Sequence, residues 1–415
     1  MSPTVSSAAR ERSRWQRTAG ALRFRDYRYL WLSQFCSGQA QWMDEVVRGW
    51  IAYQITGSPF ILGVVSASRH APLLVFGLWA GVLADRVDRR LQLIAAQWAN
   101  VLVDLTLVVL LVTERLEAWH LVALALTAGS VQSFMQPARQ AMLPKLVPRA
   151  DLMSGIALLS VAFNTSRSVG PAVAGGLIFV AGPVGAALGE VLLHFLGGLA
   201  ILLMREVPPP ERTGSGSPWA DLVEGLRYVW TTPHLAVLVT ITLVPMLVGF
   251  PYNAILPVYA KDILEIGPGG LGLLFTAAGV GAVTGLLGLG YLGDLPRKGA
   301  KLLLVLAAFG LALVIFAHSR FLPLSLLLLF GVGMTSNIFH AFVNQLLQVN
   351  TEDRYRGRVM ALYALDRGFL PFGLFSVGTL AQLLGAPMAL TIMPSIMILM
   401  TVGVALRWRS LLKLE

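Results

Sequence analysis

The chain has 415 residues, of which 56% are hydrophobic and 13% charged. Because soluble domains carry roughly 25% charged residues, this composition excludes an ordinary soluble domain and indicates a polytopic membrane protein. The formal net charge is +10, but the basic residues lie between apolar stretches without the interleaved aromatic residues of a nucleic-acid-binding face, so no nucleic-acid partner is expected. The single cysteine, Cys36, excludes an intrachain disulfide and a cysteine-based metal site.

Twelve stretches satisfy the requirement of about 20 mostly apolar residues for a membrane-spanning helix. They are expected at 27–54, 60–84, 91–113, 117–138, 152–181 and 183–204, and then at 235–261, 268–293, 299–318, 321–347, 357–383 and 386–407. The predicted fold class is an all-α polytopic membrane protein with twelve transmembrane helices in two six-helix bundles.

A long polar segment, 205–234, separates the two sets of spans. Three consecutive prolines at 208–210 and a Gly/Ser run interrupt any helix there, whereas 219–230 has the amphipathic spacing of a helix that lies along the membrane surface. The predicted organisation is an N-terminal arm (1–26), a six-helix bundle (27–204), a linker (205–234), a second six-helix bundle (235–407) and a tail (408–415).

Lys and Arg residues predict the orientation. Most of the 32 lie in the arm, in the loops after the second, fourth, sixth, eighth and tenth spans, and in the tail. This distribution predicts that both termini are cytoplasmic, in a bacterial inner membrane. The arm has no apolar core followed by a cleavage site, so we expect it to be retained.

One loop pattern occurs after the second span of each half. GVLADRVDRR (81–90) and GYLGDLPRKG (290–299) both place a glycine four residues before an aspartate. Repeated halves of this kind are typical of transporters built from parallel repeats, although the pattern is also that of a simple basic turn. The residues singled out are Gly81, Asp85, Arg86, Arg89, Arg90, Asp294 and Arg297.

The first of these loops resembles the loop motif of the major facilitator superfamily, with Asp88 in place of a second glycine. The stretches FRDYRYLWLSQF, ITGSPFILG, QPARQAMLPKLVPRADL, EGLRYVW and RGRVMALY are similar to the drug:proton antiporter branch that contains the macrolide and enterobactin exporters. The resemblance implies the major facilitator fold and export driven by a proton gradient. It also implies that Asp85 locks a cytoplasmic gate while the outer side is open. We expect the neighbouring arginines either to bind acids or anionic lipids or only to set the topology.

SVGPAVAGG in the fifth span is similar to the superfamily's antiporter signature through Gly170, Pro171 and Gly175. Ala174 stands where a glycine is expected, and the fourth span lacks the arginine that many proton-coupled exporters carry. The motif predicts either a hinge for exchange transport or close packing of small residues.

QWMDEVVRGW (41–50) places charges inside the first span. At 1.5 Å per residue, Asp44 and Arg69 lie at a similar depth, on the order of 15 Å below the outer end, and Asp104 is close to that layer. Buried charges normally pair or face water, and an acid left unpaired can carry a proton. Asp44 or Glu45 is the predicted carrier, with Arg48 and Arg69 as competing partners. The alternative is a set of closed ion pairs that only fixes helix register.

Further polar residues lie in other spans. Glu190 and His194 share a helix face and extend the predicted proton-coupling group, in which His194 either relays protons or only packs. A more apolar substrate cavity is expected toward the C-terminal half. The residues predicted to line it are Asn164, Arg167, Asn253, His340, Asn344, Asp366 and Arg367.

The sequence contains no nucleotide-binding loop, no metal-spaced His/Cys cluster and no nucleophile motif, so we expect a non-enzyme without a cofactor that is driven by an ion gradient. The resemblance implies that this is a proton gradient. The predicted function is efflux of small amphiphilic, drug-like compounds in exchange for protons by a monomer with alternating access. Two alternatives stay open: export of one physiological product such as a siderophore or a lipid-like molecule, and a non-transporting sensor or scaffold.

Overall fold

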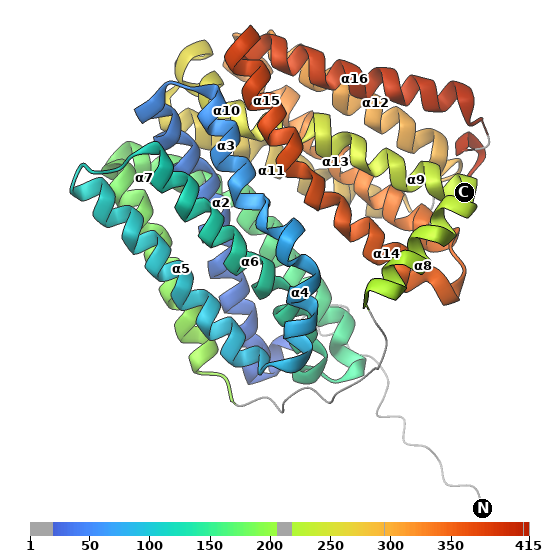
Figure 1. The fold of residues 1–415 in the computed structure, drawn as a ribbon, viewed down its shortest axis with the longest axis horizontal. Coiled ribbons are helices and arrows are strands. Elements are labelled where there is room, and N and C mark those ends of the chain that lie inside the picture. The colour runs from blue at the N-terminus through green and yellow to red at the C-terminus, as the bar shows by residue number, and fades with distance from the viewer. Residues whose placement is uncertain (1–19, 206–217, 294, 410, 415) are drawn as a thin grey trace, which may run out of the picture.

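The structure is a computed structural model that describes residues 20–205, 218–293, 295–409 and 411–414, apart from the side chains of 78, 81–86, 218–222 and 413. Helices and their connecting loops make up all of this described part. The helices of residues 20–202 lie side by side as one body, and those of 218–413 form a second body beside it (Figure 1).

The first half contains the five helices α2 to α6, preceded by the short turn η2 and followed by the long helix α7. Its elements are η2 (Gly20–Arg23), α2 (Arg25–Thr56), α3 (Pro59–His70), α4 (Pro72–Arg86), α5 (Arg89–Val112), α6 (Ala118–Leu146), η3 (Arg149–Asp151) and α7 (Leu152–Leu202). Within α7, Gly182 has φ of 70° and breaks the helix, a conformation that glycine adopts without steric cost. The break falls between the predicted fifth and sixth spans, 152–181 and 183–204.

The second half is more interrupted. Its elements are α8 (Pro218–Thr231), α9 (Pro233–Val244), η4 (Pro245–Gly249), α10 (Tyr252–Val258), η5 (Tyr259–Ile263), α11 (Gly267–Leu292), α12 (Lys298–Ala317), α13 (Leu322–Val349), α14 (Asp353–Ala364), η6 (Leu365–Phe369), α15 (Leu370–Leu384), α16 (Ala386–Arg407) and η7 (Leu411–Lys413). The predicted span 235–261 therefore consists of α9 to η5, with π-helical turns at η4 and η5. The predicted span 357–383 is divided by the 3₁₀ turn η6.

Eight helical stretches of the described chain are long and apolar enough to cross a membrane, and the 54-residue stretch Arg149–Leu202 contains two of the predicted spans. The helices α2 and α6 are also long, with 32 and 29 residues, but they are too polar to meet the same criterion. The predicted first and fourth spans are therefore present within the helices α2 and α6, which bury some of their charged side chains, such as Asp44 of α2 and Arg139 of α6.

We call the side of the molecule that carries the loops around Arg89, Arg297 and Arg356 the basic face, and the other side the opposite face. At the opposite face the two halves are bonded to each other. The Tyr53 hydroxyl donates to Asp262, and the Ser58 hydroxyl donates to Gln382 at 2.8 Å.

Close helix contacts reinforce this closure. A Cβ on Gly63 of α3 would lie 2.7 Å from the carbonyl oxygen of Leu374 on α15, and a Cβ on Gly175 of α7 would lie 2.7 Å from the carbonyl oxygen of Pro268 on α11. Glycine permits backbones to approach this closely in membrane helices. The two halves are thus packed tightly on the side of the opposite face.

The linker helix predicted at 219–230 is present as α8 and lies beside α14 (Figure 1). Glu224 accepts a hydrogen bond from Arg358 at 2.8 Å, and Tyr228 stacks on Tyr355 with ring centroids 4.1 Å apart. These contacts attach the linker helix to the second half at the basic face.

Candidate functional site

Four helices of the first half, α2, α3, α5 and α7, place buried charges in one cluster. Arg48 donates through Nε to Asp44, one turn earlier on α2, and Arg69 Nε of α3 lies 3.4 Å from the other Asp44 oxygen. Both predicted partners therefore bind the same carboxylate. The side chains of Arg48 and Asp44 are only 4% and 7% exposed.

A second carboxylate completes this layer from α5. Asp104 Oδ2 lies 2.6 Å from His194 Nδ1 of α7, and Asp104 Oδ1 lies 3.8 Å from Arg48 Nη2. His194 is buried and bonded to a carboxylate, which places it in the charge cluster and not in an apolar contact. Asp104 therefore lies in the same layer as Asp44 and Arg69, as its depth in the membrane predicted.

Glu190 is the third acid of the cluster, one helical turn before His194 on α7. It is completely buried, and neither of its carboxylate oxygens has a hydrogen-bond partner. Buried polar groups are normally hydrogen-bonded. Glu190 is therefore the acid of this cluster whose bonding is incomplete.

We call Asp44, Arg48, Arg69, Asp104, Glu190 and His194 the charge cluster. Its three carboxylates and two guanidiniums leave one excess negative charge when His194 is neutral. Oxygen atoms of Asp44, Asp104 and Glu190 lie within 4.8 Å of one another, close enough to hold a cation as well as a proton. No metal site was predicted from sequence, because these acids come from three separate helices with no motif spacing.

Glu45 lies outside the charge cluster although it follows Asp44 directly. It is half-buried, and its carboxylate lies 3.8 Å from His70 Nε2. Adjacent residues point about 100° apart around a helix, which explains why Arg48 binds only one of the two acids. His70 as a partner was missed by the sequence analysis.

A second polar group lies between the halves. A Cβ on Gly279 of α11 would lie 2.9 Å from the Arg167 carbonyl oxygen of α7. Arg167 also interacts electrostatically with Tyr252 and Arg367 of the second half. His340 Nδ1 lies 3.1 Å from the Tyr363 hydroxyl. The structure therefore brings three of the predicted cavity residues, Arg167, His340 and Arg367, to one interface, together with two tyrosines that the sequence analysis missed.

Asp366 belongs to the same region, next to Arg367 in η6. It is buried, and its Oδ2 has no hydrogen-bond partner. Within the described residues, three other predicted cavity residues form no hydrogen bond between the two halves. Asn164 donates to the Ser160 carbonyl of its own helix at 2.8 Å, Asn344 accepts from Gln348 at 2.6 Å, and Asn253 is half-buried in α10.

The predicted hinge residues lie within a continuous helix. The only non-helical backbone inside α7 is at Gly182, so Pro171 causes no break. A Cβ on Gly170 would lie 2.9 Å from Trp42 Cβ on α2, and Gly175 contacts α11. These contacts support the small-residue packing alternative, and the hinge stays a prediction.

The loop motifs are described only in part. The side chains of Gly81, Asp85 and Arg86, and all of Asp294, lie outside the described residues. Arg89 donates to the Ala141 carbonyl at 3.1 Å and Arg90 to the Leu202 carbonyl at 2.7 Å, while Arg297 begins α12 with φ of 54°. Gating by these residues stays a prediction.

Asp88 has a clear local role. Its carboxylate accepts a hydrogen bond from the Arg90 backbone N–H at 2.8 Å and caps α5. An aspartate at this position satisfies a free helix amide. The departure from the glycine of the family motif is therefore accounted for by helix capping.

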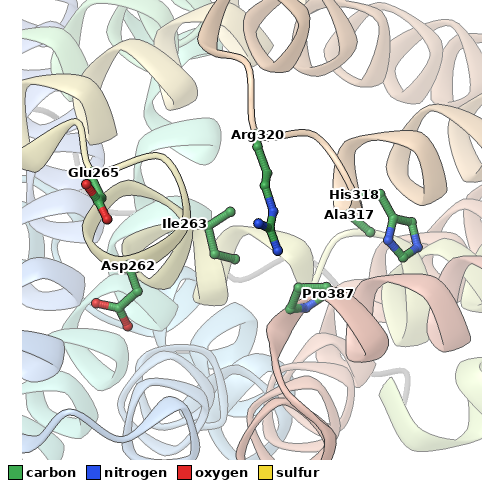
Figure 2. A pocket seen from close by; sticks show the side chains of 7 residues that line it. All are labelled: Asp262, Ile263, Glu265, Ala317, His318, Arg320 and Pro387. Carbon is green, nitrogen blue, oxygen red and sulfur yellow. The ribbon is translucent and has the colours of Figure 1, made fainter.

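Two cavities lie away from these groups. A pocket of about 290 Å³ at the opposite face is lined by Asp262, Glu265, His318 and Arg320, among others. In Figure 2 the two acids lie on one side of it and His318 on the other, with Arg320 between them. An apolar groove of about 560 Å³ runs between α9 and α16 and includes Trp230 and Trp408.

Comparison with known proteins identifies relatives. The family profile described as transmembrane secretion effector, of the major facilitator type, matches residues 17–414. The multidrug efflux pump Tap of Mycolicibacterium fortuitum is 29% identical over 348 residues, which cover 81% of this chain and 84% of that protein. The staphyloferrin A transporter of Staphylococcus aureus is 25% identical over 88% of this chain and 92% of that protein. The crystal structure of nucleoside transporter NupG has a TM-score of 0.73 at 12% identity, covering 94% of this chain and all of that one.

Proposed function

The chain belongs to the transmembrane secretion effector family of the major facilitator superfamily, and from this premise we propose that it expels small amphiphilic compounds in exchange for protons. Members of this superfamily are integral membrane transporters, and the relatives identified above are transporters. The first half would supply proton coupling, and the interface between the halves would bind substrate. Both termini would be cytoplasmic, so the basic face would be the cytoplasmic side.

The observation that carries the proposal is the unpartnered carboxylate of Glu190 inside a cluster with one excess negative charge. An uncompensated charge inside the membrane costs roughly 2.5–3.5 kcal/mol even on insertion scales. One proton on the cluster removes that excess. Among its acids, Asp44 is held by two arginines and Asp104 by His194, so Glu190 is the best site for the proton.

Alternating access would connect this proton to transport. In the structure the halves are bonded at the opposite face through Tyr53 and Asp262. Opening that face would bring external water and protons to the cluster, and closing it would trap the proton that neutralises Glu190. Release on the cytoplasmic side would complete an exchange for substrate.

The coupling ion can be tested directly. Liposomes that contain the protein are loaded with an amphiphilic compound, such as a macrolide or an anionic dye, and are given an inward proton gradient or an inward sodium gradient at matched membrane potential. The proposal expects substrate export with the proton gradient alone. Export with the sodium gradient alone would instead indicate that the three acids bind a metal cation.

A single physiological product is the second candidate substrate. It is favoured by the similarity to the staphyloferrin A transporter, which extends over 88% of this chain. The same liposomes loaded with a siderophore distinguish the two, since a dedicated exporter would move the siderophore and leave the drugs inside.

A further inference from the structure

Two arginines of the interface between the halves, Arg167 and Arg367, form no close ion pair within the described residues, although Arg367 interacts electrostatically with the neighbouring Asp366 carboxylate. Within the described parts of the chain, no carboxylate lies within 4.0 Å of the Arg167 or Arg367 guanidinium, in contrast to Arg48 and Arg69. Arg167 comes from α7 and Arg367 from η6, and the two interact as like charges. Like charges held together are unfavourable, so this arrangement calls for a negative group between them.

A buried hydrogen-bond donor without an acceptor lies beside Arg167. Arg167 lies over the Trp42 ring, 5.5 Å from its centroid, and Trp42 Nε1 is buried without a hydrogen-bond acceptor. One acceptor is also free, Asp366 Oδ2. With Asp366 counted against the two arginines, the group keeps one excess positive charge when His340 is neutral.

Aromatic side chains border the same place. Phe250 stacks on His340 with centroids 5.4 Å apart, and Tyr252 of α10 interacts with Arg167. Aromatic faces and guanidinium planes bind flat rings, and arginine binds carboxylates in a fixed geometry. The chemistry therefore favours a flat apolar body that carries an acidic group.

We infer that the transported compound is an aromatic organic anion whose carboxylate lies between Arg167 and Arg367, with its ring against Trp42 and Phe250. This inference rests on the proposed function and narrows its substrate class. Each half contributes one arginine, so the anion would bridge the halves.

The test uses two xanthene dyes of the same shape, fluorescein as the anion and rhodamine 123 as the cation. Binding to the full chain in nanodiscs of zwitterionic lipid is followed by fluorescence anisotropy. Because a charge-assisted hydrogen bond is lost, Arg167→Gln and Arg367→Gln are each expected to weaken fluorescein binding by about 10-fold or more. Arg115→Gln, at an exposed loop, is the control and should change nothing.

Lysine variants at 167 and 367 keep the charge and separate a binding loss from misfolding. They should retain more fluorescein affinity than the glutamine variants. Tighter binding of rhodamine 123 than of fluorescein, or glutamine variants that bind fluorescein as well as Arg115→Gln does, would overturn the inference. Fluorescein binding that depends on both arginines, without any proton movement in liposomes, would uphold the anion site and refute proton exchange instead.

Discussion

Replacing Arg48 by glutamine tests whether the charge cluster is a desolvated network. Arg48 binds Asp44 and lies 3.8 Å from Asp104, and its side chain is 4% exposed. Its removal raises the excess negative charge of the cluster from one to two. Breaking a buried pair costs about 3–5 kcal/mol, so we expect a loss of that size in the free energy of unfolding, measured by detergent titration in mixed micelles.

The matched control is Arg356→Gln. Arg356 also pairs with an aspartate, Asp353 at 2.6 Å, but the two side chains are 45% and 89% exposed, and exposed pairs contribute about 0–1 kcal/mol. The double variant Arg48→Gln with Asp44→Asn returns the cluster to one excess charge and should recover at least part of the loss. If Arg48→Gln costs no more than Arg356→Gln, water reaches the cluster and the reasoning is refuted.

Two further predictions concern the closed opposite face. Gly175→Ala places a Cβ 2.7 Å from the Pro268 carbonyl oxygen, whereas a Cβ on Gly176 meets nothing within 4 Å. We therefore expect Gly175→Ala to slow transport in liposomes severalfold and Gly176→Ala to leave it unchanged. Equal transport rates of the two variants would contradict the packing argument. Tyr53→Phe removes the hydrogen bond to Asp262, worth roughly 1 kcal/mol, and should raise the population open at that face about fivefold in spin-label distance distributions; an unchanged distribution would show that this bond does not hold the face closed.

The depth of the charged residues was predictable from sequence. Counting residues from the ends of antiparallel spans placed Asp44, Arg69 and Asp104 in one layer, and the structure joins the first two at 3.4 Å and brings Asp104 to Arg48. Helical rise is nearly constant, so depth follows from position alone. The break at Gly182 between two long apolar stretches was predictable for the same reason.

It was not predictable from sequence which acid binds the arginines and which acid stays without a partner. Asp44 and Glu45 are adjacent, and only the rotation of α2 decides that Asp44 meets both arginines while Glu45 meets His70. Glu190 reaches the cluster because α7 reverses at Gly182, and its lack of a partner depends on the packing of every neighbouring helix. The interruptions of the seventh span at η4 and η5 likewise follow from prolines whose local effect varies with tertiary contacts.

The most direct test of the account compares Glu190→Gln with Glu45→Gln in liposomes that contain a pH dye. Glu45 is the control because it lies on the same helix as Asp44 but outside the charge cluster. We expect Glu190→Gln to carry substrate down its gradient without moving protons, and Glu45→Gln to move both substrate and protons. Proton movement by Glu190→Gln at the rate of the unaltered protein would contradict it.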